Sequence, residues 1–128
     1  MPSQWAPQVK YKTNYGPSGD SFAQRFKAKY NTDSDYHSAG GYGAGLIFQH
    51  AIEQAGSVDP AKVAAALDTT NITTLFGPCK FSTDPASHGL QLVHQMVLTQ
   101  WQMKDGQLVK PVIWPAAAAT APILYPIH

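Results

Sequence analysis

The sequence predicts a mixed fold, α/β or α+β, in which about three helices pack on a small, largely antiparallel sheet. Two observations carry this prediction. Residues 18–68 repeat apolar side chains at helical spacing, whereas residues 72–113 contain short runs that alternate as strands do. A lead-in, residues 1–17, and a Pro- and Ala-rich tail, residues 114–128, flank these parts. At 128 residues, the whole chain, 1–128, is expected to form a single domain.

The first helix is expected to follow the turn signal Gly16-Pro17, because Ser18 can cap a helix that begins there. Apolar rings then recur every fourth residue, at Phe22, Phe26 and Tyr30. This spacing places the three rings on one face of the helix. The polar run that follows Tyr30 is expected to end it.

The longest helix is predicted roughly from His37 to Ala55, and Gly56 ends it in the left-handed conformation that glycine tolerates. Four glycines crowd its first turns, and no apolar strand precedes them and no Lys-Ser/Thr follows them, which argues against a phosphate-binding loop. Close packing against a neighbour is the better explanation. The predicted apolar stripe comprises Ala44, Ile47, Phe48, Ala51, Ile52 and Ala55, widened by Tyr42 and Leu46.

A short third helix is expected to begin at Asp59-Pro60, an N-cap followed by proline at the first helical position. Asp68 to Thr74 is interpreted as a polar connection. Lys104-Asp105-Gly106 is typical of a hairpin turn. The second predicted strand is apolar on both faces and therefore requires cover on both. The strands are predicted at Leu75–Phe81, Gln91–Gln102 and Leu108–Ile113.

Composition limits the function. Charged residues make up 13% of the chain, about half the usual ~25%, which suggests that a partner or a second copy covers some apolar surface. The net charge of +1 and the lack of a basic cluster argue against a nucleic-acid partner. No apolar run reaches the ~20 residues of a membrane span. Met1 to Lys12 contains no signal-peptide core, so the chain as given is expected to stay cytoplasmic if expressed alone.

No catalytic, metal or cofactor site is predicted. The five histidines show no ligand spacing with each other or with cysteine. Cys79 is the sole cysteine, so an intrachain disulfide is excluded. A nucleophilic pair of Cys79 with a histidine has no local signature. An enzyme is therefore the least favoured function, and we predict that the chain is not one.

The order of several motifs resembles the C-terminal portion of the periplasmic solute-binding proteins of ABC importers, in the branched-chain amino acid (Leu/Ile/Val-type) family. The resemblance runs from about Trp5 into the tail. It rests on Tyr42-Gly43 before the long helix, then Phe76-Gly77-Pro78 with Phe81, then His88-Gly89. It implies a partial type I periplasmic-binding-protein fold. Complete members are considerably longer and close two lobes on a ligand, so the chain is expected to be part of such a protein.

The resemblance also implies a ligand site. In this family an aromatic-containing segment before the matching helix faces the cleft, and Tyr36 or His37 falls at that place. Tyr42 is either a further ligand contact or a core residue. The implied solute is an amino acid, an amide or an aromatic acid, and the implied partner is the membrane permease of an ABC importer. The implied compartment is the periplasm.

Two other functions stay open. The chain could be a stand-alone module that associates with itself, because its helices and strands would otherwise lack the sheets on which they pack in the family. A homo-oligomer is therefore expected. A small Cys/His enzyme is the third reading.

Overall fold

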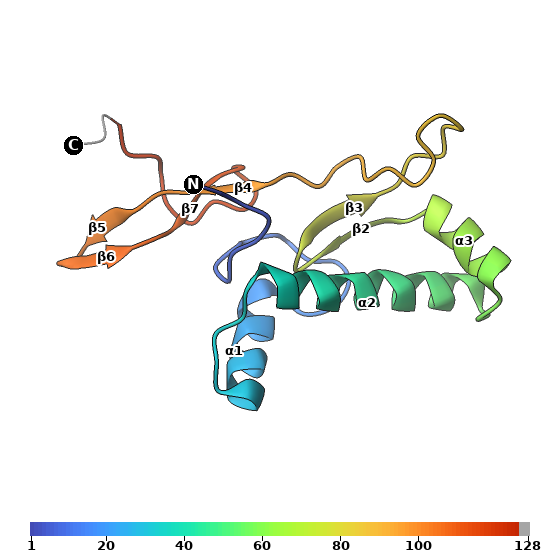
Figure 1. Ribbon diagram of the computed structural model, residues 1–128, viewed down its shortest axis with the longest axis horizontal. Helices are drawn as coiled ribbons and strands as arrows, with labels where there is room; N and C mark the ends of the chain where they lie inside the picture. The colour runs from blue at the N-terminus through green and yellow to red at the C-terminus, as the bar shows by residue number, and fades with distance from the viewer. Residues whose placement is uncertain (126–128) are drawn as a thin grey trace.

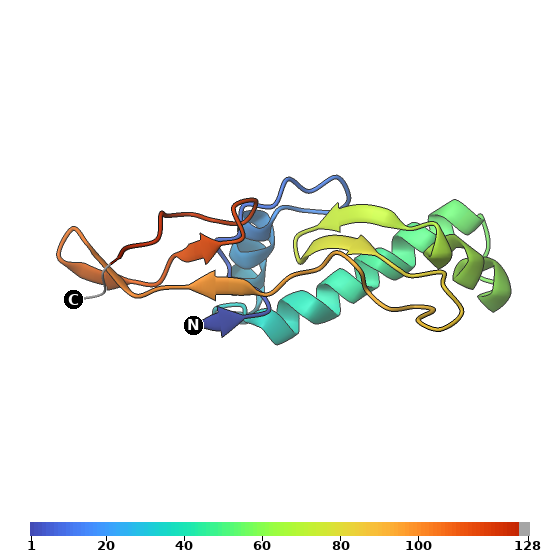
Figure 2. The same cartoon turned by 90° about the horizontal axis from the view of Figure 1, so that it is seen from above.

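Helices α1 and α2 lie on one side of three small antiparallel sheets in the computed structural model, which describes residues 1–125 (Figures 1 and 2). This mixed architecture confirms the predicted fold class. The helices are α1 (Gly19–Tyr30), α2 (Tyr36–Ala55) and α3 (Pro60–Asp68). The strands are β1 (Pro2–Ser3), β2 (Asn71–Thr74), β3 (Gly77–Lys80), β4 (Val97–Thr99), β5 (Gln102–Lys104), β6 (Gln107–Val109) and β7 (Val112–Trp114). Among the described residues, none of the helices combines the length and apolarity needed to cross a bilayer.

The helix ends follow the local sequence signals. Ser18, Asp35 and Asp59 are the N-caps, and each accepts a hydrogen bond from a backbone amide of the first turn. Asn31 and Gly56 end α1 and α2 in the left-handed conformation, with φ of 52° and 58°. The predicted boundaries of the helices are therefore confirmed to within a residue or two.

The buried face of α2 differs from the predicted stripe. Phe48 and Ile52 are 57% and 37% exposed, and Ala44 is exposed as well. The prediction was right for Leu46 and Ala51 and wrong for these three residues, because α2 also packs through Ala39 and Gly43, which lie outside the predicted stripe. Its buried residues are Ala39, Gly43, Leu46 and Ala51.

Two of the four clustered glycines account for this close approach. A Cβ at Gly43 would lie 3.1 Å from the Cβ of Phe76, and one at Gly40 would lie 3.5 Å from the Phe76 ring. Among the described residues, nothing lies within 4 Å of a Cβ added at Gly41 or Gly45. Close packing is thus confirmed for Gly40 and Gly43 only.

The strands are shorter than predicted and pair differently. The expected connection before Leu75 contains β2, which forms a hairpin with β3 in the register Asn71↔Lys80 to Thr74↔Gly77. The predicted strand Gln91–Gln102 forms strand only at β4 and, from Gln102, in β5. Before β4 the chain is irregular because the Gln91 side chain accepts hydrogen bonds from the backbone amides of Lys80 and Val93. These two amides are therefore not available for a regular ladder between β3 and the segment that begins at Gln91.

The last predicted strand, Leu108–Ile113, is divided in two. The two-residue turn Asp105-Gly106, with φ of 51° and 75°, joins β5 to β6 as the sequence indicated. Pro111 then interrupts the ladder, and β7 pairs with β4 instead. Residues 126–128 of the predicted tail lie outside the described residues.

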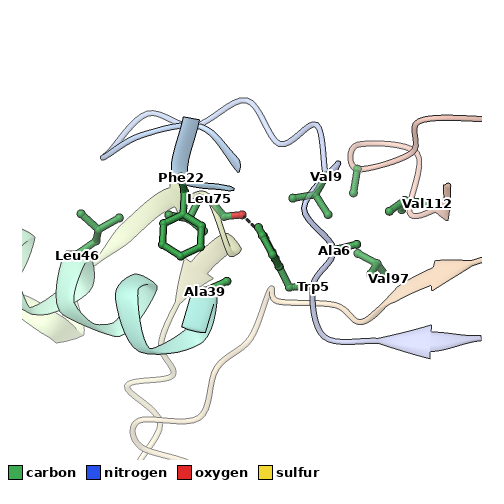
Figure 3. Packing of buried hydrophobic residues seen from close by; sticks show 10 residues of the cluster. Trp5, Ala6, Val9, Phe22, Ala39, Leu46, Leu75, Val97 and Val112 are labelled. Carbon is green, nitrogen blue, oxygen red and sulfur yellow. Dashed lines mark hydrogen bonds between the residues drawn. The ribbon is translucent and has the colours of Figure 1, made fainter. Parts of the chain in front are cut away.

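The lead-in contributes to the core, which the sequence did not predict. Strand β1 pairs with β4, so that the sheet order is β1-β4-β7. Trp5 is 2% exposed and lies between the helices and the sheet, where its Nε1 donates to the carbonyl oxygen of Leu75 at 2.9 Å (Figure 3). The core cluster comprises Trp5, Ala6, Val9, Phe22, Ala39, Leu46, Leu75, Val97, Val112 and Ala118.

Candidate functional site

A groove of about 470 Å³ opens between α1 and the first turns of α2. Its volume lies within the roughly 300–1,000 Å³ typical of small-molecule sites. Four of its ten lining residues are phenylalanine or tyrosine, and two are cations of α1. The lining residues are Pro17, Phe22, Arg25, Phe26, Lys29, Tyr30, His37, Ser38, Gly41 and Tyr42.

Helix α1 supplies one wall through its four-residue repeat. Phe22 is buried and anchors that wall to the core, because its ring packs edge-on against Trp5 at a centroid distance of 5.9 Å. Phe26 lies 5.7 Å from Phe22, and Tyr30 lies 4.7 Å from Phe26. The rings therefore form a continuous apolar strip along α1, and its outer end is open to a ligand.

The start of α2 supplies the opposite wall. Asp35 and Ser38 form a capping box in which the Ser38 amide donates to Oδ1 of Asp35 at 2.8 Å. This box fixes the position at which His37 enters the groove. One turn later the Tyr42 ring packs on Phe22 at 5.0 Å while 39% of the residue stays exposed. Tyr42 is thus both a packing residue and a lining residue.

The structure brings together two of the three predicted site residues. His37 and Tyr42 line the groove, whereas Tyr36 does not. The Tyr36 ring lies 3.9 Å from the His37 ring, centroid to centroid, and Tyr36 is 40% exposed. Tyr36 therefore packs against His37 from outside the groove. Of these two alternatives, His37 is the residue that faces this groove, and which of them touches a ligand stays a prediction.

The charges of the groove are unequal. Arg25 and Lys29 are the lining cations, and the lining contains no carboxylate. The nearest carboxylate to His37 belongs to Asp35, with 3.4 Å between Oδ2 and Nδ1. The pKa of Asp35 is lowered, first by the backbone hydrogen bond from Ser38, which holds this carboxylate at the cap in its charged form.

Sequence reasoning did not assign Arg25 and Lys29 to a site. Both residues flank the apolar positions of the helical repeat, which is the usual position of solvated cations. The signal that could have revealed them is their four-residue spacing beside Phe22, Phe26 and Tyr30, because residues at this spacing are neighbours on a helix surface.

A second, smaller cavity of about 230 Å³ lies between α2 and the β2–β3 hairpin, and Cys79 and His94 are among its lining residues. Burial raises the pKa of the Cys79 thiol and lowers the pKa of His94. The His94 ring stacks on Phe76 at 5.0 Å, and its Nε2 is buried without a hydrogen-bond partner among the described residues. A buried thiol with a raised pKa is a poor nucleophile. Within residues 1–125, no group of three or more potential metal ligands gathers.

Comparisons with known proteins concern the family and the fold of this chain. The family model described as "Periplasmic binding protein" matches residues 2–107. The fold is similar to the crystal structure of the leucine binding protein LivK from Thermotoga maritima MSB8, with a TM-score of 0.58 and 23% sequence identity. The match covers 85% of this chain and 28% of that protein, so the chain corresponds to less than a third of its length. The predicted resemblance and the partial periplasmic-binding fold are therefore confirmed, and the chain belongs to the periplasmic binding protein family.

Proposed function

We propose that this chain is a solute-binding component, or part of one, of an ABC-type importer for amino acids or related small molecules. In this proposal it works in the periplasm, the compartment of its family, and delivers its solute to a membrane permease. The groove between α1 and α2 contacts the solute. The observation that carries the proposal is that His37 and Tyr42, at the segment expected to touch the ligand, line a groove of solute size.

The groove has the physical properties of a small-solute site. Its rings supply apolar area, and the backbone near them is bare at Gly41, which lines the groove without a side chain. Such a surface holds the body of an amino acid, an amide or an aromatic acid.

Two glycines of α2 allow a matched test by thermal shift. Gly41 lines the groove and Gly45 does not, yet both are exposed and helical, with nothing within 4 Å of an added Cβ among the described residues. Gly41→Leu should fill the groove without disturbing the fold, and Gly45→Leu is the control. A screen of amino acids, amides and aromatic acids should stabilise the wild type and the control, by about 2.7 kcal/mol at ~100 times the dissociation constant. Gly41→Leu should lose this response. If no compound stabilises the wild type, or if Gly41→Leu responds like Gly45→Leu, the proposal is wrong.

Self-association is the second candidate, and a specific observation favours it. The side of α2 that carries Gly45, Phe48 and Ile52, here called the outer ridge, is exposed. The paired residues Met103 and Leu108 of the β5–β6 hairpin are 66% and 61% exposed. A homo-oligomer would remove such apolar area from water. Multi-angle light scattering should detect it at micromolar concentration, and Phe48→Gln should weaken it. A stable wild-type monomer would exclude this candidate.

An enzyme that uses Cys79 and His94 is the third candidate. The raised pKa of the buried thiol opposes this function. A hydrolase activity that Cys79→Ser abolishes would support it.

A further inference from the structure

We infer that the groove between α1 and α2 selects an organic acid, with the carboxylate of the ligand held by Arg25 and Lys29 and its aromatic or branched body held by the rings. This inference rests on the proposed solute-binding function and narrows its ligand class from amino acids, amides and acids to anions.

The first argument is the imbalance of charge in the groove. Two of the ten lining residues are cations and none is an anion. Within the described part of the chain, neither Arg25 nor Lys29 takes part in a salt bridge. Lys27, on the same helix but outside the lining, is paired with Asp33 at 2.9 Å. Of the two lysines of α1, Lys27 has a carboxylate partner and lies outside the groove, whereas Lys29 lines the groove.

The second argument is geometric. Arg25 and Lys29 are four residues apart on α1, so their side chains leave the helix about 5–6 Å apart and can converge on one carboxylate. A guanidinium can offer two parallel N–H donors to a carboxylate, and the ammonium adds a further charged donor. Lysine near a helix C-terminus also stabilises the helix dipole, but this effect requires no groove and no aromatic neighbour.

The third argument is the position of the rings beside these cations. The Lys29 Nζ lies 5.2 Å from the centroid of the Tyr30 ring, which holds the ammonium next to the apolar strip rather than away from it. Phe26 stands between Arg25 and Lys29 in sequence and lines the same groove. A ligand with its carboxylate at the cations can therefore place a ring against Phe26 and Tyr42. A neutral amide of the same shape would gain the ring contacts and lose the charged hydrogen bonds.

Two probes of nearly identical shape, phenylacetate and phenylacetamide, test the inference by isothermal titration calorimetry. The wild type should bind phenylacetate about tenfold or more tightly than the amide, since hydrogen bonds to charged groups are stronger than neutral ones. The double variant Arg25→Gln/Lys29→Gln should remove this preference, because phenylacetate loses its two cationic partners in the groove. The control Lys27→Gln/Lys62→Gln, with the same loss of charge outside the groove, should keep the preference.

Equal binding of the two probes to the wild type, or an acid preference that survives in Arg25→Gln/Lys29→Gln, would overturn the inference and leave the solute-binding proposal intact. The same holds if neither probe binds while a neutral amide of the stabilisation screen does so and Gly41→Leu blocks that binding. If no compound of any class binds, both proposals are wrong. The comparison of the two probes on the wild type needs no variant, so a failure of the double variant to fold would not remove the test.

Discussion

Three glycines of α2 provide a sharp test of how this helix packs. Gly41, Gly43 and Gly45 share one helix, but the structure gives them different surroundings. Among the described residues, an added Cβ meets nothing within 4 Å at Gly41 or Gly45. At Gly43 it would lie 3.1 Å from the Cβ of Phe76 and 3.7 Å from the Cγ of that ring. The substitution Gly→Ala therefore changes helix propensity by the same amount at all three sites, but it changes the packing at Gly43 alone.

The expected magnitudes follow from these distances. Gly→Ala inside a helix stabilises it by about 0.5–1 kcal/mol, because glycine loses more backbone entropy on folding. Gly41→Ala and Gly45→Ala should show this gain. At Gly43 the opposing atom is the Cβ of Phe76, which is attached to the backbone and cannot rotate away. Overpacking of this kind costs about 1–3 kcal/mol. Gly43→Ala should therefore be less stable than Gly41→Ala by about 1–3 kcal/mol.

Urea unfolding followed by circular dichroism measures these differences directly. In a thermal scan, each kcal/mol should appear as roughly 3–6 °C for a chain of this length. A Gly43→Ala variant as stable as Gly41→Ala would refute the close approach of α2 to Phe76. A loss of stability in Gly45→Ala that grows with protein concentration would mean that a second copy covers this residue.

Three further predictions concern the core, the second cavity and the α2 cap. Trp5→Phe should cost about 2–4 kcal/mol in urea unfolding, because the buried Leu75 carbonyl loses its donor and a cavity remains; a cost below about 0.5 kcal/mol would contradict this. Burial lowers the pKa of His94 in the folded state. The fold therefore keeps its full stability above about pH 6.5, the ordinary pKa of histidine, and loses stability as the pH falls toward the lowered pKa. His94→Gln should flatten the change in Tm between about pH 7 and 5. Asp35 has a lowered pKa, so Asp35→Ala should lower Tm at pH 7 and have a shrinking effect below about pH 4.

Short-range features of this fold were predictable from the sequence because a few neighbouring residues determine them. The cap at Asp59-Pro60 and the turn at Asp105-Gly106 each satisfy their hydrogen bonds and dihedral angles locally. Strand pairing is different, since a strand forms only where a partner lies beside it. The alternation from Gln91 onward is compatible with a strand, yet only Val97–Thr99 finds neighbours, in β1 and β7. Nothing in the window of the sequence around β4 specifies these distant partners.

The site was predictable in part for a related reason. His37 and Tyr42 lie in the first two turns of α2, whose start is fixed by its own cap at Asp35, so their location followed from the order of the motifs. The second wall depends on how α1 crosses the start of α2, and a tertiary contact sets this crossing, namely the packing of Phe22 on Tyr42 at 5.0 Å. Arg25 and Lys29 acquire a site only through that contact. Helical periodicity alone describes them as solvated cations.

The two proposals for this chain are physically linked through one side of α2. Gly41 lines the groove, and Gly45, Phe48 and Ile52 of the outer ridge continue from it at spacings of four, three and four residues, which follow the same side of a helix. A body that covers the outer ridge would therefore reach the mouth of the groove and shield a bound acid from water. Shielding strengthens the attraction between a carboxylate and the cations Arg25 and Lys29, because the effective dielectric constant falls. Solute binding should then become tighter as the protein concentration rises, and Phe48→Gln should abolish this dependence without touching the groove. Affinity for phenylacetate that is independent of protein concentration, in a protein that does associate, would show that the outer ridge and the groove act separately.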